Sequence, residues 1–111
     1  MAKQYEVLVL PEAQDDIRSI VLYIAKDLHA VDAAMDLNEK LHKSITTLAE
    51  MPERFQVIDE EPWRSVNVRR MAVGSYYVYY WILRSEPIVE ILSVVYIGRD
   101  QREHLKRSIK H

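Results

Sequence analysis

The chain has 111 residues, a formal net charge of −2 and no cysteine. This length favours a single domain over residues 1–111, and the lack of cysteine excludes disulfides and thiolate metal sites. No apolar run approaches the roughly 20 residues that span a membrane, and the N-terminus mixes charged with apolar residues, unlike a signal peptide. We therefore expect a cytoplasmic protein with no membrane partner.

The first half of the chain predicts a strand and two helices. Residues 5–10 are rich in Val and Leu and indicate a buried strand. Pro11 suits a first helical turn, and a helix is predicted over residues 12–28 from an apolar stripe of Ile17, Ile20, Val21, Ile24 and Leu28. A second stripe predicts a helix over residues 32–51, formed by Ala34, Leu37, Leu41, Ile45 and Leu48. The short link makes the pair a helical hairpin, in which we expect a shared core of Ile17, Ile20, Ile24, Leu37, Leu41 and Ile45.

The second half predicts three strands, over residues 65–73, 76–83 and 88–97. Gly74-Ser75 and residues 84–87 provide the turns, and such short links favour antiparallel neighbours. The expected fold class is α+β: an N-terminal strand, a helical hairpin and a three-stranded antiparallel meander, forming one sheet with two helices on one face. The other face is expected to stay partly open, at the aromatic strand and the arginines.

Charge is distributed unevenly along the chain. Residues 1–62 hold 6 Lys and Arg against 13 Asp and Glu, whereas residues 63–111 hold 9 against 4. The two sums, −7 and +5, give the net charge of −2. A basic half on a mildly acidic chain favours one anion-binding surface. Solvated strand ends and a basic tail would give the same count, so charge alone does not choose between the two interpretations.

Arginines at strand ends beside aromatic rings are typical of phosphate binding and base stacking. Arg69 and Arg70 are adjacent on one predicted strand, so their side chains point to opposite faces and at most one serves the open face. Arg99 follows the last strand, and Arg102 lies beyond it. If these arginines converge, their mutual repulsion favours an anion between them. For any single arginine, a surface ion pair is the ordinary alternative.

The strand over residues 76–83 carries aromatic side chains on both faces. Tyr76 and Tyr80 share one face, and Tyr77, Tyr79 and Trp81 share the other. Most of these rings are expected in the core, because aromatic residues favour strands. A tyrosine beside an arginine can also stack or transfer a proton.

Histidines give weaker indications of chemistry. His104 is the histidine near the basic region and can act as acid or base close to neutral pH, although an exposed tail histidine is the ordinary alternative. The four histidines lack metal-ligand spacing, and the chain has neither a glycine-rich phosphate loop nor a nucleophile elbow. We expect no metal site and no cofactor.

Several short segments have a distinctive order and spacing along the chain: Tyr5-Glu6-Val7, Ala13-x-x-Asp16-Ile17, Tyr23-Ile24, Leu48-Ala49-Glu50-Met51-Pro52-Glu53-Arg54-Phe55, Trp63-Arg64, Val68-Arg69-Arg70-Met71-Ala72-Val73 with Tyr76, and Tyr96-Ile97-Gly98-Arg99-Asp100. In this order and spacing the chain resembles the RelE/ParE superfamily of bacterial toxins over nearly its whole length. The resemblance implies a small toxin that a cognate antitoxin neutralises. RelE-like members cleave mRNA on the ribosome without a metal, whereas ParE-like members poison DNA gyrase.

Residue by residue, the resemblance implies functional roles for two arginines. Arg70 and Arg99 fall on basic positions of the RelE-like nucleases. Tyr77 stands where those nucleases carry a further basic residue, and Leu105 stands near their C-terminal tyrosine, with His104 beside it.

From the sequence we favour a type II toxin that cleaves mRNA on the ribosome as a metal-independent endoribonuclease. Arg70 and Arg99 would stabilise charge on the attacked phosphate, and Tyr80 or His104 would transfer the proton. The remaining predicted RNA- or target-binding residues are Arg64, Arg69, Tyr77 and Arg102. The alternative is a non-enzymatic, ParE-like inhibitor of DNA gyrase that uses the same end of the sheet, and an inactive, antitoxin-binding relic is a third possibility.

Overall fold

The computed structural model of the chain describes residues 4–98. Its elements follow the predicted order: β1 (Glu6–Val9), α1 (Pro11–Leu22), a π-helical turn (Tyr23–Asp27), α2 (Val31–Thr46), two 3₁₀ turns (Thr47–Ala49 and Pro52–Arg54), β2 (Arg69–Val73), β3 (Tyr76–Leu83) and β4 (Ile88–Tyr96). No helix in the described range is long and apolar enough to cross a membrane.

One four-stranded sheet holds the strands in the order β1-β4-β3-β2, and β2, β3 and β4 form the predicted antiparallel meander. β1 completes the sheet by pairing parallel to β4. Gly74, in the turn between β2 and β3, has a φ of 59°, a conformation that glycine adopts without steric cost. This turn sets Val73 opposite Tyr76 and thereby fixes the register of the hairpin.

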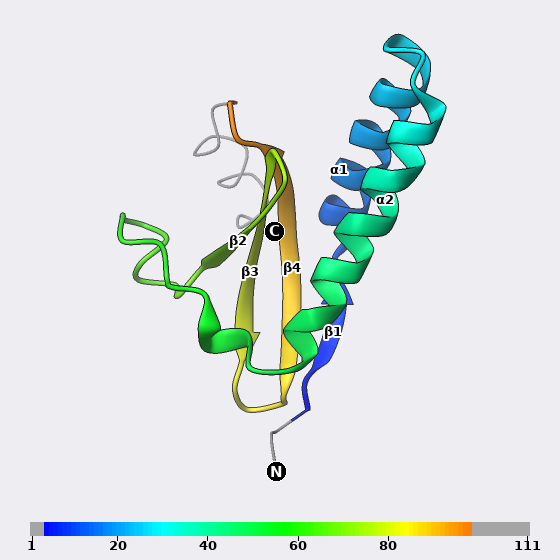
Figure 1. Ribbon diagram of the computed structural model, residues 1–111. Helices are drawn as coiled ribbons and strands as arrows, with labels where there is room; N and C mark the ends of the chain where they lie inside the picture. Colours follow the sequence, from blue (N-terminus) through cyan, green and yellow to red (C-terminus); the bar gives the residue numbers. More distant parts are fainter. Residues whose placement is uncertain (1–3, 99–111) are drawn as a thin grey trace.

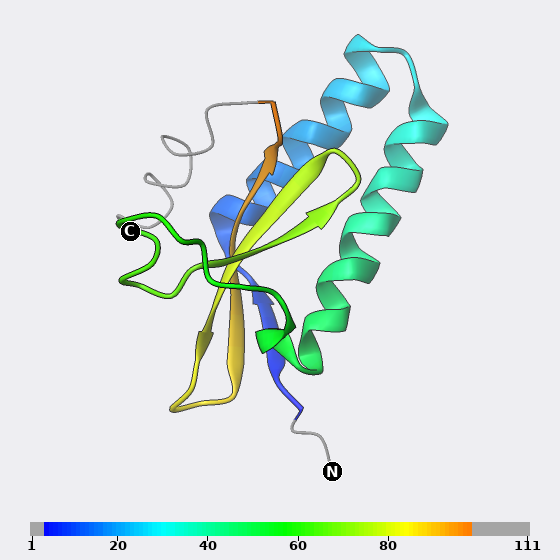
Figure 2. The ribbon, with the colours of Figure 1, turned by 60° about the vertical axis from the view of Figure 1, so that its left-hand side comes forward.

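The main core lies between the sheet and the two helices. The helices run next to each other on one face of the sheet, opposite the connection that precedes β2 (Figures 1 and 2). Ile17, Leu41 and Ile45 are buried in it, and Ile20 and Leu37 pack against it half-buried. These contacts confirm the predicted α+β layering, with both helices on one face of one sheet.

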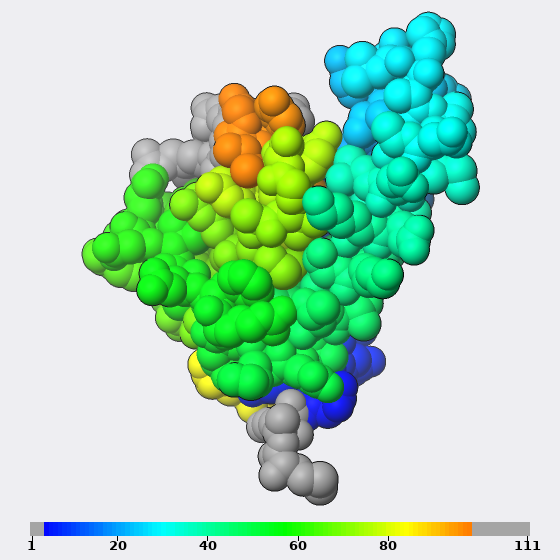
Figure 3. All heavy atoms as spheres, viewed as in Figure 1, coloured from blue at the N-terminus to red at the C-terminus, as the bar shows by residue number. Residues whose placement is uncertain are grey.

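The predicted apolar stripe does not continue to Leu28, which is 55% exposed. Residues Tyr23–Asp27 form a π-helical turn, whose wider hydrogen-bonded ring moves the following side chains out of the α-helical register. The end of the hairpin, residues 22–35, also extends past the sheet and stands clear of the strands in Figures 1 and 3. We call this segment the hairpin tip. Among the described residues, Leu28 belongs to neither core cluster.

A second, smaller core lies on the opposite face of the sheet. Trp63 and Val68, from the connection between α2 and β2, pack against Tyr79 and its neighbours Leu92 and Val95. The Val68 amide donates to the carbonyl oxygen of Trp63, so residues 65–68 belong to this connection and β2 begins only at Arg69. The face that was predicted to stay partly open is therefore covered at Tyr79.

Asp16 joins α1 to an irregularity in β4. The pairing of β3 with β4 shifts by one residue between Tyr79, opposite Ser93, and Tyr80, opposite Ile91. At this bulge the Asp16 carboxylate accepts hydrogen bonds from the Ser93 hydroxyl and the Val94 amide, both at 3.0 Å. Ala13, one turn earlier on α1, is fully buried and lets the helix approach the sheet closely.

Replacing Asp16 with alanine is expected to destabilise the fold by about 1–3 kcal/mol, because the hydroxyl of Ser93 and the amide of Val94, both buried residues, lose their acceptor. Chemical denaturation of the purified chain measures this loss. Asp15→Ala is the matched control, since Asp15 forms only an exposed pair with Arg18, and such a pair is worth about 0–1 kcal/mol. Equal losses in the two variants would show that the Asp16 contacts contribute nothing special.

Candidate functional site

Arg69 and Arg70 lie on opposite faces of β2, as predicted from strand alternation. Arg69 is opposite Tyr80, and Arg70 is opposite Tyr79. The Arg69 guanidinium donates to the carbonyl oxygens of Glu53, at 3.1 Å, and Phe55. Arg69 therefore holds the segment that follows α2 through its Nη1. This placement gives Arg69 a structural contact, and its predicted role in target binding stays a prediction.

Tyr80 braces the same segment from within the core. It is fully buried, and its hydroxyl donates to the carbonyl oxygen of Pro52 at 2.7 Å. Burial raises the pKa of Tyr80 to about 12, against a weaker opposing effect of the Arg69 charge. A sealed, protonated phenol neither reaches a substrate nor accepts a proton at neutral pH. The burial of the Tyr80 hydroxyl argues against its predicted proton-transfer role.

Arg54 completes this brace, although it was not among the predicted site residues. Its guanidinium donates to the carbonyl oxygens of Thr47, at 3.2 Å, and Glu50, at 2.7 Å, near the end of the helical segment, where basic side chains often donate to the last carbonyls. The guanidinium carbon also lies 4.9 Å from the centre of the Phe55 ring. Arg54, Arg69 and Tyr80 together hold the segment over residues 47–55 in place.

Arg64 forms ion pairs with acidic residues of its own loop. Its guanidinium pairs with the carboxylates of Asp59 and Glu61, both at 3.2 Å, and these partners raise the pKa of Arg64. Glu61 also accepts hydrogen bonds from the amide and hydroxyl of Ser65. The positive charge of Arg64 is locally neutralised, which weakens its predicted role in binding an anionic target.

Arg70 has a different environment. It is exposed on the edge strand β2, and its guanidinium carbon lies 4.3 Å from the centre of the Tyr77 ring. Burial raises the pKa of Tyr79, while a hydrogen bond with Arg70 and the Arg70 charge act in the opposite direction. Tyr77 and Tyr79 themselves pack edge to face, with ring centres 6.1 Å apart. Two tyrosines thus orient one exposed cation.

Within residues 4–98, the other arginines meet carboxylates or carbonyl oxygens. Arg18, Arg64 and Arg84 pair with carboxylates, and Arg54 and Arg69 donate to carbonyls. In this range Arg70 is the arginine that meets neither kind of acceptor. An oriented guanidinium with unused donors is a suitable binding group for a phosphate or carboxylate of a target.

Tyr79 was missing from the predicted site, although the sequence contains the information to find it. A two-residue turn at Gly74-Ser75 sets Val73 opposite Tyr76, and counting outward from that pair brings Arg70 opposite Tyr79. The predicted site residues Arg99, Arg102 and His104 lie outside the described residues. The predicted convergence of Arg70 with Arg99 therefore stays a prediction.

The comparison with protein families decides the identity of this fold. The family described as "ParE toxin of type II toxin-antitoxin system, parDE" matches residues 7–101. The chain belongs to the ParE toxin family. The predicted RelE/ParE resemblance is thereby confirmed, and the chain is a toxin of a type II toxin-antitoxin system.

Solved structures support the ParE fold. The chromosomal ParDE system of P. aeruginosa aligns with a TM-score of 0.70 and 12% identity, over 86% of this chain and 99% of that chain. The Mycobacterium tuberculosis RelBE2 toxin-antitoxin complex aligns with a TM-score of 0.59 and 17% identity, over 84% of this chain and 91% of that chain. A free E. coli RelE toxin with two arginines replaced by alanine aligns with a TM-score of 0.63 and 17% identity, over 99% of this chain and 97% of that chain. At such low identities these likenesses show the fold alone, and no curated protein sequence matches the chain.

Proposed function

We propose that this ParE-family toxin catalyses no reaction and acts by binding DNA gyrase. The binding surface is the one around the exposed Arg70 and the Tyr77 ring beneath it, which we call the Arg70 surface. The observation that supports this proposal is the contrast between Arg70 and Tyr80. Arg70 is exposed and has unused donors, whereas Tyr80, the proton-transfer candidate within residues 4–98, is sealed in the core. In the same range no carboxylate or imidazole contacts Arg70, and burial raises the pKa of Tyr79, which favours its protonated form. Such a site suits binding better than proton transfer.

We infer that a cognate antitoxin covers the same surface. An exposed arginine without a carboxylate partner is a favourable contact for an acidic segment, because a charge-assisted hydrogen bond replaces hydration on both sides. Two of the similar structures are a ParDE system and a RelBE2 toxin-antitoxin complex, which supports a partner of this kind. Antitoxin and target would then compete for Arg70.

The alternative is cleavage of mRNA on the ribosome. The stacking of Arg70 on Tyr77 favours this candidate, because the same pair could hold a phosphate and present an aromatic surface to a base. The 2′-hydroxyl of the RNA would attack the adjacent phosphate, and Arg70 with Arg99 would stabilise the charge that develops. With Tyr80 sealed, His104 would remain as the proton-transfer candidate.

Controlled expression in bacteria separates the two candidates. We expect double-strand DNA breaks and a DNA-damage response to precede any fall in protein synthesis. With the purified chain and gyrase, we expect inhibited supercoiling or accumulation of cleaved plasmid. An immediate stop in translation with cleaved mRNA and intact DNA would replace the gyrase proposal by the nuclease. Arg70→Ala, expressed to the same level, is the matched control for both readouts.

A further inference from the structure

The hairpin tip exposes five large apolar side chains within residues 22–35. Met35 is 64% exposed, Val31 57%, Leu28 55% and Tyr23 54%, and Leu22 is 43% exposed. Single exposed apolar residues are ordinary, but a group of this size on one projecting element is typical of a protein-binding surface. The tip protrudes beyond the strands in Figures 1 and 3, so it is open to an approaching partner.

The backbone of the tip has two unusual features, a π-helical turn and a residue with a positive φ. The π-helical turn Tyr23–Asp27 ends with the Leu28 amide donating to the carbonyl oxygen of Tyr23. His29 then adopts a left-handed φ of 52°, an uncommon conformation for a residue with a side chain. Both features depart from the simplest helical hairpin, and π-helical turns and strained residues concentrate at functional positions.

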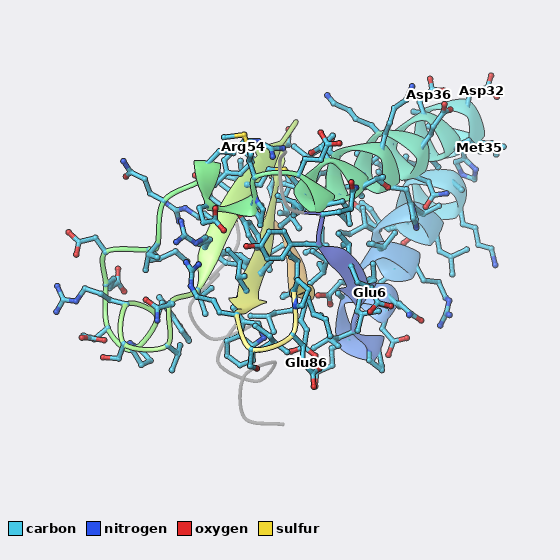
Figure 4. All side chains as sticks on the ribbon, turned by 90° about the horizontal axis from the view of Figure 1, so that it is seen from below. Glu6, Asp32, Met35, Asp36, Arg54 and Glu86 are labelled. Carbon is cyan, nitrogen blue, oxygen red and sulfur yellow. The ribbon has the colours of Figure 1, made fainter. Side chains whose placement is uncertain are left out.

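Charge at the tip selects what can bind there. A hollow of about 630 Å³ is lined by Val21, Met35 and Asn38 and by the acidic residues Asp32, Asp36 and Glu39. Figure 4 shows Asp32, Met35 and Asp36 together at the outer end of α2. Within the described part of the chain, none of these carboxylates forms an ion pair. Their charges are available to a cationic partner.

We propose that the hairpin tip is a docking surface for a basic amphipathic helix of a partner protein, separate from the Arg70 surface. Leucine-like side chains of that helix would cover Leu28, Val31 and Met35, and lysine or arginine side chains would reach the carboxylates around the hollow. Residues 22–39 carry Lys26 against Asp27, Asp32, Asp36 and Glu39, a formal charge of −3. This charge opposes a second copy of the tip, an anionic membrane and a nucleic acid alike.

The two surfaces belong to different elements. Arg70 lies on β2, on the face that carries Tyr77 and Tyr79, whereas the tip is the far end of the helices that cover the other face. A helix bound at the tip would leave Arg70 free. The toxin could therefore hold its target or antitoxin at one surface and a basic partner at the other, so Arg70→Ala should not affect docking at the tip.

The test uses the purified full chain and a fluorescein-labelled peptide of about 15 residues, with Leu on one helical face and Lys on the other. We expect saturable binding by fluorescence anisotropy. The double variants Leu28→Ser with Met35→Ser, and Asp32→Asn with Asp36→Asn, should each weaken binding about tenfold or more. A peptide with Glu in place of Lys should not bind.

Glu6→Gln with Glu86→Gln is the matched control, because it removes the same charge at positions far from the tip (Figure 4). We expect this control to bind the Lys peptide within about twofold of the unaltered chain. Unchanged affinity in the tip variants, or an equal loss in the control, would overturn the proposal. It would also fail if the chain formed dimers that Met35→Ser dissociates, because a second copy would then be the occupant. Thermal unfolding of each variant verifies that the fold is intact.

Discussion

Replacing Arg70 with alanine is expected to abolish toxicity while leaving the fold intact. Arg70 is exposed and its contacts in the described range are two tyrosines, so its removal costs about 0.5–1 kcal/mol of stability, the value of an exposed cation–π contact. Truncation of a central interface arginine weakens binding by about 2 kcal/mol or more, which is roughly 30-fold. If the chain is instead a nuclease, loss of one charge-stabilising donor lowers the rate about 10²–10³-fold. Growth after induced expression measures toxicity, and thermal unfolding measures stability.

Two further variants make the Arg70 result specific. Arg70→Lys keeps the positive charge but loses the planar guanidinium that stacks on Tyr77, so intermediate toxicity is expected. Arg64→Ala removes an arginine that Asp59 and Glu61 already neutralise, and this variant should stay fully toxic. If Arg70→Ala kills as effectively as the unaltered chain, the functional surface lies elsewhere on the toxin.

Tyr80→Ala is expected to unfold much of the population, because it removes a fully buried aromatic ring from the main core. Large-to-small changes of this kind cost about 3–5 kcal/mol, against a total stability of about 5–15 kcal/mol for a small domain. Tyr80→Phe keeps the ring but leaves the Pro52 carbonyl without its donor, at a cost of about 1–3 kcal/mol. Denaturation in an Arg70→Ala background, which allows safe expression, measures both values.

Toxicity of the Tyr80→Phe variant distinguishes a structural hydroxyl from a chemical one. We expect this variant to remain toxic at a temperature where it is folded, because the Tyr80 hydroxyl reaches only the Pro52 carbonyl. Complete loss of toxicity with an intact fold would restore a proton-transfer role for Tyr80.

The sequence predicted the layout of the elements well because periodicity reports burial. The apolar spacing of Ile17, Leu41 and Ile45 identifies the helix faces that meet the sheet, and all three are buried. The turn at Gly74-Ser75 likewise predicts the antiparallel pairing of β2 with β3. Both signals are local, since they depend on residues within a few positions of each other.

The candidate site was harder to predict because it depends on which face a distant segment covers. Strand alternation correctly separated Arg69 from Arg70 and Tyr80 from Tyr79, but alternation does not say which face remains accessible. Accessibility depends on the connection between α2 and β2, which covers part of the sheet with Trp63. The carbonyls of Pro52 and Phe55 in the same connection accept hydrogen bonds from Tyr80 and Arg69. None of these residues follows a periodic pattern in the sequence. Tyr80 was therefore assigned to proton transfer and Arg69 to target binding, whereas in the structure both hold the segment that follows α2.

The bracing of Arg69 has a kinetic consequence for its neighbour. Because Arg69 is tied to the Glu53 and Phe55 carbonyls and sits directly before Arg70, the backbone that carries Arg70 is fixed before any partner arrives. Tyr77 and Tyr79 restrict the guanidinium in the same way. Little rotamer freedom is left to lose on association, a loss that ordinarily costs about 0.5–1.5 kcal/mol for a long side chain. Such rigidity is expressed mainly in slower dissociation, so a captured target should be held for a long residence time.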